Sequence, residues 1–169
     1  MVVLADTHLR TVPVDGRRKS RPLPEVVRAA LAGAAAILHA GDLLDAGVLG
    51  SLAGYAPVHA VLGNNDVSLV GRLPHTLTVD LAGVRVGMIH DSGPSRGRAA
   101  RLRRRFPDAA VVVFGHSHAP VAEAGEGGQL LFNPGSPTQR RAQPVCTYGE
   151  LYLAGGAVIG HRIIPVGSD

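Results

Sequence analysis

Five short apolar runs in this chain are each followed by side chains that can bind metal ions or exchange protons. The polar residues that follow these runs are Asp6 and His8, Asp42, Asn64 and Asp66, His90, and His116 and His118. Short runs rich in β-branched residues are typical of buried strands. Because the residues just past strand ends of an α/β domain gather at one edge of a sheet, we expect these side chains to share one crevice. Such a set of oxygen and nitrogen ligands, without a thiolate, is enough for two divalent metal ions.

The order of the predicted elements indicates a layered α/β fold. Strands are predicted at residues 2–6, 36–39, 57–62, 76–81, 84–90, 110–114, 129–132, 145–153 and 157–165. Helices are predicted at 24–34, 45–54 and 95–106, and a basic loop at 9–22. The runs on either side of Ala82-Gly83 predict an antiparallel hairpin. We therefore expect two facing sheets with helices outside, in a single domain over residues 1–169.

Composition narrows the class of protein. Hydrophobic residues make up 46% of the chain, and the single cysteine, Cys146, excludes an intrachain disulfide and a cysteine-based metal cluster. We expect Cys146 to be a small core residue. The chain has no signal-peptide pattern and no apolar run near the ~20 residues of a membrane span, so we expect a cytoplasmic protein.

Charge and aromatic content bear on the substrate. The formal net charge of +4 favours anionic substrates. Aromatic residues are only 4% of the chain and Trp is absent, which disfavours single-stranded nucleic acid as a partner, because its bases need stacking platforms.

The spacing of the ligand candidates differs from that of helical zinc motifs. His116 and His118 are two residues apart, so they do not share a helix face, and Gly115 allows a sharp turn at the strand end. Asp6 and His8 have the same spacing. Carboxylate, imidazole and amide ligands suit Mn, Fe, Zn or Ni. Asp42 is the candidate bridge between two ions, which would lie about 3.5–4 Å apart.

In these residues the chain resembles the calcineurin-like metallophosphoesterase superfamily, and within it the branch of small prokaryotic phosphodiesterases. The matching blocks are Asp6-Thr7-His8, Gly41-Asp42, Gly63-Asn64-Asn65-Asp66, His90, Gly115-His116-Ser117-His118 and Asn133-Pro134-Gly135-Ser136. The resemblance implies a four-layer αββα sandwich of two mixed sheets flanked by helices. It extends from the first strand to residue 136, and we expect it to continue to residue 169.

The resemblance also implies a ligand set for two divalent metal ions. Asp6, His8 and His118 would hold the first ion, Asn64, His90 and His116 the second, and Asp42 both. Asp66 would orient the site from behind, and the loop at 133–136 would lie near the pocket rim. Mn is the metal we expect, with Ni, Fe, Zn and Mg as alternatives.

Three positions depart from the family pattern, and of these Ala5, which stands where serine is common, is expected to matter little. Asn65 stands where many phosphatases of the superfamily have a histidine that assists the leaving group, and an amide is no general acid at neutral pH. This favours diesters with good leaving groups, or proton delivery from another residue or from water. Asp91 follows His90 where glycine is usual, and would either disturb the second ion's pocket or add a polar group.

We therefore expect a phosphodiesterase that acts on a small phosphoester, in which a hydroxide between two metal ions attacks phosphorus in line with the leaving group. The catalytic residues would be Asp42, Asn64, Asp66 and His90. A phosphomonoesterase or nuclease of the same superfamily is one alternative. The other is an interaction scaffold with an impaired site, like a retromer subunit of similar fold. The chain would be a monomer or a homo-oligomer, without membrane contact.

Several other polar residues stay outside this assignment. A dense basic run consists of Arg96, Arg98, Arg101, Arg103, Arg104 and Arg105. A solvated helix face is favoured for it over a nucleic-acid backbone site. The basic residues Arg17, Arg18 and Lys19 would either steer phosphate or belong to a surface loop. Histidines without ligand context are His39, His59, His75 and His161, of which His39 and His59 are expected to be structural.

Overall fold

The computed structural model describes residues 1–11 and 22–167, which form two five-stranded mixed sheets packed face to face. The first sheet has the strand order β10-β9-β1-β2-β3. Its strands are β1 (Val2–Leu4), β2 (Ile37–His39), β3 (Val58–Ala60), β9 (Cys146–Ala154) and β10 (Ala157–Val166). Strands β1, β2 and β3 pair in parallel, with β3 at one edge, whereas β9 pairs antiparallel with both β1 and the other edge strand, β10.

The second sheet has the strand order β4-β5-β6-β8-β7. Its strands are β4 (Thr76–Leu81), β5 (Val84–Ile89), β6 (Val111–Val113), β7 (Val121–Ala124) and β8 (Leu130–Asn133). Here β5, β6 and β8 are parallel, and β4 and β7 are antiparallel edge strands. The predicted hairpin around Ala82-Gly83 is confirmed as the β4–β5 pair.

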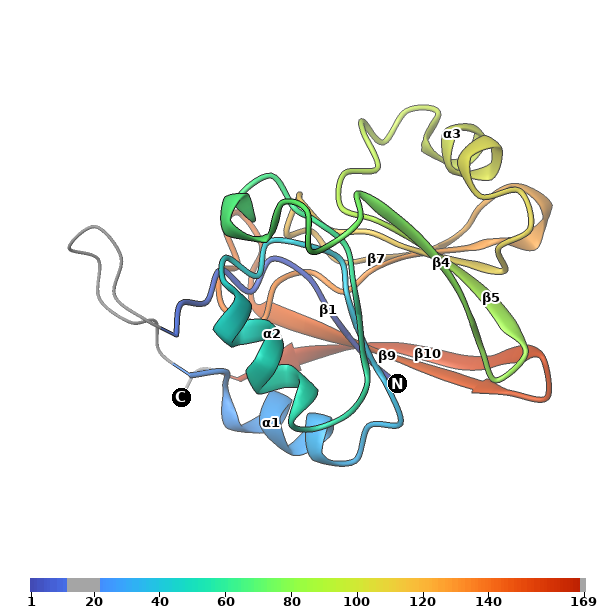
Figure 1. Cartoon of the computed structure of the whole chain (residues 1–169). Helices are drawn as coiled ribbons and strands as arrows, with labels where there is room; N and C mark the ends of the chain where they lie inside the picture. Colours follow the sequence, from blue (N-terminus) through green and yellow to red (C-terminus); the bar gives the residue numbers. More distant parts are fainter. Residues whose placement is uncertain (12–21, 168–169) are drawn as a thin grey trace.

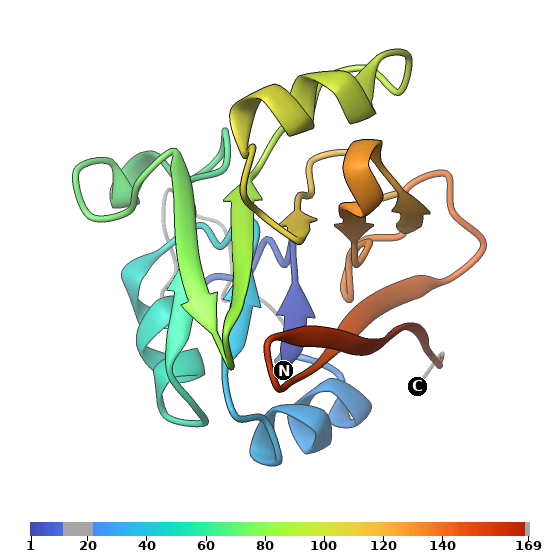
Figure 2. The ribbon, with the colours of Figure 1, turned by 90° about the vertical axis from the view of Figure 1, so that its right-hand side faces the viewer.

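Helices cover the outer faces of both sheets, so the molecule has four layers (Figures 1 and 2). Helices α1 (Glu25–Ala32) and α2 (Ala46–Ala53) pack on the first sheet, and α3 (Arg98–Arg105) packs on the second. Two short 3₁₀ turns, η1 (Val67–Leu69) and η2 (Glu126–Gly128), complete the elements. The predicted αββα sandwich is confirmed. Among the described residues, no helix has the length and apolar character needed to cross a bilayer.

Alternation along the strands explains why whole apolar runs are buried. Val2 and Leu4 of β1 face the helices, whereas Val3 between them faces the other sheet. In β6, Val111 and Val113 face the first sheet and Val112 faces α3. Side chains alternate between the two faces of a strand, and both faces are covered here, so every position is apolar.

Several local features differ from what the sequence predicts. Strand β1 ends at Leu4 rather than at residue 6, because Asp6 has a left-handed φ of 52°. Helix α3 begins at Arg98 rather than at 95, because Gly97 has a φ of 71°, outside the helical range. Strand β7 was not predicted from the sequence, because it is a largely exposed edge strand and contains no apolar run. Cys146 is only half-buried, at the border of the core and the start of β9.

Candidate metal centre

The predicted ligands follow the carboxyl ends of parallel strands from both sheets. Asp6 and His8 follow β1, Asp42 follows β2, Asn64 follows β3, His90 follows β5, and His116 and His118 follow β6. The two sheets pack with these ends at the same edge, so ligands that are far apart in the sequence meet there. The structure brings together all seven predicted ligand residues.

Five of these ligand residues have a left-handed backbone. Their φ values are 52° for Asp6, 45° for His8, 60° for Asp42, 68° for His116 and 57° for His118. Non-glycine residues in this region cost about 1–3 kcal/mol each, and they persist where surrounding contacts determine them. The turns aim side chains from the strand ends into the crevice, so the strain is concentrated at the candidate site.

The first ligand group consists of Asp6, His8 and His118, whose ligand atoms all lie within 4.8 Å of one another. The two Nε2 atoms of His8 and His118 are 3.2 Å apart, and His118 Nε2 is 3.6 Å from Asp6 Oδ1. His118 Nδ1 donates to the carbonyl oxygen of Gln139 at 2.6 Å. Because that carbonyl only accepts, Nε2 of His118 presents its lone pair to the crevice.

The second ligand group is built around the amide oxygen of Asn64. This oxygen lies 3.0 Å from His90 Nε2 and 3.0 Å from His116 Nδ1. His90 Nδ1 donates to the carbonyl oxygen of Ala40 at 2.7 Å, so Nε2 of His90 also points its lone pair toward the crevice.

Asp42 lies between the two groups. Its Oδ2 is 3.5 Å from His8 Nε2 and 3.6 Å from His90 Nε2. Asn65 holds the carboxylate with its backbone amide, 2.9 Å from Oδ1, and with Nδ2, 2.7 Å from Oδ2. Burial raises the pKa of Asp42, but the hydrogen bonds from Asn65 and the nearby imidazoles outweigh this and leave the pKa below its usual value. Asp42 is therefore an oriented anion that lies between the two ligand groups.

The carboxylate of Asp6 accepts no hydrogen bond from the residues that the structure describes. Both oxygens are buried, His118 Nε2 lies 3.6 Å from Oδ1, and the His116 amide is near enough to lower the pKa. Burial and the neighbouring Asp42 raise the pKa of Asp6 to about 8. A buried carboxylate without donors is costly, and a divalent cation is the partner that would stabilise its charged form. With two imidazoles facing the same point, the residues present fit a metal ion.

Asp66 anchors the loops that carry the ligands. Its Oδ2 accepts from the backbone amides of Asp42 and Gly63, and its Oδ1 from that of Leu44, each at 2.8 Å. The carboxylate of Asp66 thus accepts hydrogen bonds from backbone amides and does not point at the ligand groups. This geometry supports the predicted orienting role.

The loop at 133–136 lies behind the ligand loops rather than at the pocket rim, where we expected it. Asn133 and Ser136 are fully buried. Asn133 Nδ2 donates to the carbonyl oxygen of Gly115 at 3.0 Å, and Ser136 Oγ donates to that of Asp6 at 2.7 Å. These bonds fasten the turns after β6 and β1, and so explain the motif as a support for the ligands.

Arg141 is a neighbour of the centre that no sequence pattern predicted. Its Nη1 donates to the carbonyl oxygen of His116 at 3.1 Å. Burial lowers the pKa of His8 and of His118, and the charge of Arg141 lowers both further. Neutral imidazoles are the form that binds metal ions. The only signal in the sequence is its place five residues after Ser136.

Two other predictions concern residues near the centre. His39 is structural as expected: it is fully buried, its Nε2 lies 3.0 Å from Thr7 Oγ1, and burial lowers its pKa to about 3. Arg17, Arg18 and Lys19 lie outside the described residues.

Comparisons with known proteins agree with this geometry. Residues 1–155 match the family model of the calcineurin-like phosphoesterase superfamily domain. A probable metallophosphoesterase of Methanothermobacter thermautotrophicus is 35% identical over 141 residues, which cover 82% of this chain and 77% of the relative.

Two solved structures show the same fold. Vps29 of Entamoeba histolytica, complexed with Zn²⁺, has a TM-score of 0.71 at 21% identity and covers 98% of both chains. A structure described as a novel archaeal phosphodiesterase has a TM-score of 0.68 at 18% identity, over 97% of this chain and 98% of its own.

Proposed function

Because this chain belongs to the calcineurin-like phosphoesterase superfamily, we propose that it is a metal-dependent phosphodiesterase with two divalent ions at the described centre. The observation that carries the proposal is the pair of buried, unsatisfied oxygens of Asp6, surrounded by imidazoles from both sheets. Asp6, His8 and His118 would hold one ion, Asn64, His90 and His116 the other, and Asp42 both. Manganese is the proposed metal.

Two bound divalent ions would polarise the phosphoryl oxygens and lower the pKa of water for an in-line attack on phosphorus. The protein groups contribute orientation. Asn65 and Asp66 hold Asp42 and its loop, and the carbonyl oxygens of Ala40 and Gln139 fix the rings of His90 and His118. The side chains of Asp42, His90 and His118 are thus oriented before a substrate binds.

The surroundings of Asn65 support diesters with good leaving groups as substrates. Its side chain is engaged by Asp42 at 2.7 Å, so it is a positioning residue and offers no proton to a departing alkoxide. An aryl or similarly acidic leaving group departs without a general acid. The description of the archaeal neighbour as a phosphodiesterase agrees with this preference.

The test is hydrolysis of bis(p-nitrophenyl) phosphate and of p-nitrophenyl phosphate by metal-stripped protein, with Mn, Ni, Zn or Mg added back and bound metal counted. We expect metal-dependent turnover, faster on the diester, and highest with Mn. Asp42→Ala should reduce turnover by more than about 100-fold, because even the outer partners of metal ligands contribute about 10–100-fold.

The matched control is Asp80→Ala, which removes an exposed carboxylate that pairs with Arg85 next to the β4–β5 turn. This variant should keep wild-type turnover and metal content. Two bound ions without hydrolysis of either ester would replace the proposal with the interaction scaffold, and normal turnover by Asp42→Ala would disprove the bridging role.

A further inference from the structure

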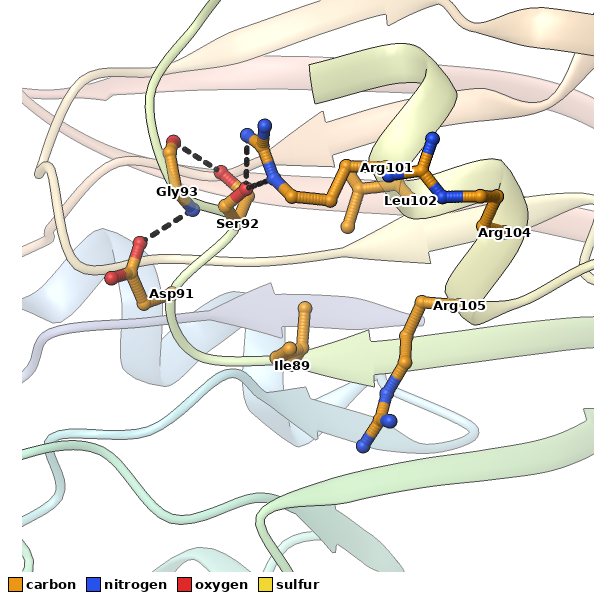
Figure 3. A pocket seen from close by; sticks show the side chains of 8 residues that line it. All are labelled: Ile89, Asp91, Ser92, Gly93, Arg101, Leu102, Arg104 and Arg105. Atoms are coloured by element: carbon orange, nitrogen blue, oxygen red, sulfur yellow. Dashed lines mark hydrogen bonds between the residues drawn. The ribbon is translucent and has the colours of Figure 1, made fainter. Parts of the chain in front are cut away.

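Two adjoining hollows lie beside the candidate metal centre, and the same segment lines both. Asp91, Ser92 and Gly93 contribute to a cavity of about 450 Å³ and to another of about 270 Å³. This segment directly follows the ligand His90. Figure 3 shows the larger cavity, with the segment on one side and the arginines of α3 on the other.

The smaller cavity borders the candidate metal centre. It is lined by His116, one of the predicted ligands, and by its neighbours Gly115 and Ser117. Residues 91–93 line both cavities, so the two hollows together, which we call the path, border the centre at His116 and extend to the arginines of α3.

The lining of this path is strongly basic. Arg98 lines the smaller cavity, and Arg101, Arg104 and Arg105 line the larger one, against the single acid Asp91. Asp91 is engaged by the backbone amide of Gly93, 2.7 Å from its Oδ1. Hollows lined by one sign of charge concentrate the opposite sign, so the path favours an anion.

The arginines have different tasks. Arg101 donates to the carbonyl oxygens of Ser92 and Pro94, at 2.6 Å from its Nη2 to each, and so shapes the loop. Arg98 faces Glu123 at 3.6 Å and lies over the ring of Phe114, while its Nε is buried without an acceptor. Arg101 and Arg98 are thus engaged within the protein and form part of the walls of the two cavities.

Arg104 and Arg105 are the cations left for a ligand. Arg105 makes one long hydrogen bond, 3.4 Å to Thr76 Oγ1. Within residues 1–11 and 22–167, Arg104 makes neither a hydrogen bond nor an ion pair. Both side chains extend from the last turn of α3, beside the larger cavity (Figure 3).

We propose that this path is a subsite for a second phosphate group, carried by a substrate whose scissile diester lies at the metal centre. The inference rests on the proposed function and narrows its substrate class to small phosphodiesters with an additional phosphate, such as nucleotide derivatives. No Phe, Tyr or Trp lines either hollow, so the subsite recognises charge and offers no platform for stacking bases.

The test compares two chromogenic diesters with the same leaving group: thymidine 5′-(p-nitrophenyl phosphate) and its 3′-phosphorylated form. We expect the added phosphate to lower KM by about 5–10-fold, the range of one or two charge-assisted contacts at a partly exposed site. In the double variant Arg104→Gln/Arg105→Gln the ratio of the two KM values should fall close to one.

Arg103→Gln is the matched control. It removes one charge from the same turn of α3, but Arg103 lies over Gly127 and lines neither hollow. This variant should keep the wild-type ratio of KM values. The subsite would be disproved if Arg103→Gln lowered the ratio of KM values as much as the double variant does. It would also be disproved if the wild type had the same KM for both diesters.

Binding separates this inference from the proposed function. Calorimetry with metal-loaded protein compares thymidine 3′,5′-bisphosphate with thymidine 5′-monophosphate, and needs no turnover. If neither ester is hydrolysed, the proposed function fails, and tighter binding of the bisphosphate that is lost with Arg104 and Arg105 still supports the subsite. Equal affinity for both nucleotides contradicts it.

Discussion

Asp6 combines a buried carboxylate with a left-handed backbone and a raised pKa. Each of these features destabilises the metal-free protein, and the chain tolerates all three at one residue. A bound cation would reverse two of them, because it stabilises the carboxylate form and satisfies the orphaned oxygens. The carboxylate of Asp6 is thus placed to bind a cation, since the described residues donate no hydrogen bond to it.

The first prediction concerns the stability of the metal-free protein. Burial raises the pKa of folded Asp6 to about 8, whereas the unfolded chain loses this proton near pH 4. Between these values the folded state holds more protons, so the contribution of Asp6 to the free energy of unfolding falls as pH rises. The maximal slope is about 1.4 kcal/mol per pH unit.

Urea unfolding of metal-free wild type and Asp6→Asn, from pH 5 to pH 8, measures this contribution. Groups away from Asp6 titrate alike in both proteins, so the difference reports Asp6 together with the groups it contacts, Asp42 and His118. We expect the variant to gain stability relative to the wild type as pH rises. A constant difference over this range would mean that Asp6 is already ionised in the folded protein.

The second prediction assigns a positioning role to Asn65. Asn65→Ala removes the side-chain hydrogen bond to Asp42 Oδ2 but keeps the backbone bond. We expect metal affinity to fall by about 10–100-fold, as for other partners that orient a ligand. Calorimetric titration with Mn measures it. Ser68→Ala is the control, because the Ser68 hydroxyl donates to the carbonyl oxygen of Leu44 and not to a ligand residue. If both variants bind Mn with equal affinity, Asn65 has no positioning role.

Among the elements, the loops after the strands need close backbone packing to bring their ligands together. Gly41 precedes Asp42 with a φ of +87°, and a Cβ there would lie 2.6 Å from His90 Nδ1 and 2.7 Å from the Gly63 backbone nitrogen. The loops after β2, β3 and β5 converge at this point. A side chain would push His90 away from the carbonyl oxygen that orients it.

The third prediction follows from this convergence. Gly41→Ala should lower the free energy of unfolding by about 1–3 kcal/mol, because the φ is unfavourable and the space is filled. It should also weaken metal binding. Gly50→Ala, in α2 with open space around it, is the control and should stabilise by about 0.5–1 kcal/mol. Chemical unfolding of both variants measures the difference, and equal effects would contradict the packing argument.

In the molecule as a whole, each sheet contributes about half of the ligand residues of the candidate metal centre. Asp6, His8 and Asp42 follow strands of the first sheet, and His90 and His116 follow strands of the second. The distances between these groups depend on how the inner faces pack. Phe132 is fully buried in that inner core, where it also fills the space over Gly149.

The fourth prediction is that Phe132→Ala destabilises the protein by about 3–5 kcal/mol, since it leaves a large cavity between the sheets. Metal affinity should fall as well, because the two halves of the centre lose their common support. Ile159→Ala, at a side chain that is 67% exposed, should stay within about 0.5 kcal/mol of the wild type. Full metal affinity in a strongly destabilised Phe132 variant would show that the loops alone define the centre.

The predictability of the elements depended on their environment. Strands buried on both faces, such as β6, carry uninterrupted apolar residues and were found from the sequence. The edge strand β7 is largely exposed, pairs with β8 alone and contains no apolar run. Only its hydrogen bonding with β8 therefore identifies it as a strand. Helix α3 is shorter than expected because a left-handed glycine, not a change in composition, starts it.

The ligand types and their order along the chain were determined by the sequence, because each lies at the end of an apolar run that has to be buried. Strand ends therefore predict which side chains share an edge of a sheet. The tertiary structure alone decided how these side chains meet. It placed Asn65 on Asp42, Ser136 behind Asp6 and Arg141 on His116, through contacts between residues up to 130 positions apart. Local pattern carries no information about such contacts, since they depend on how two sheets pack.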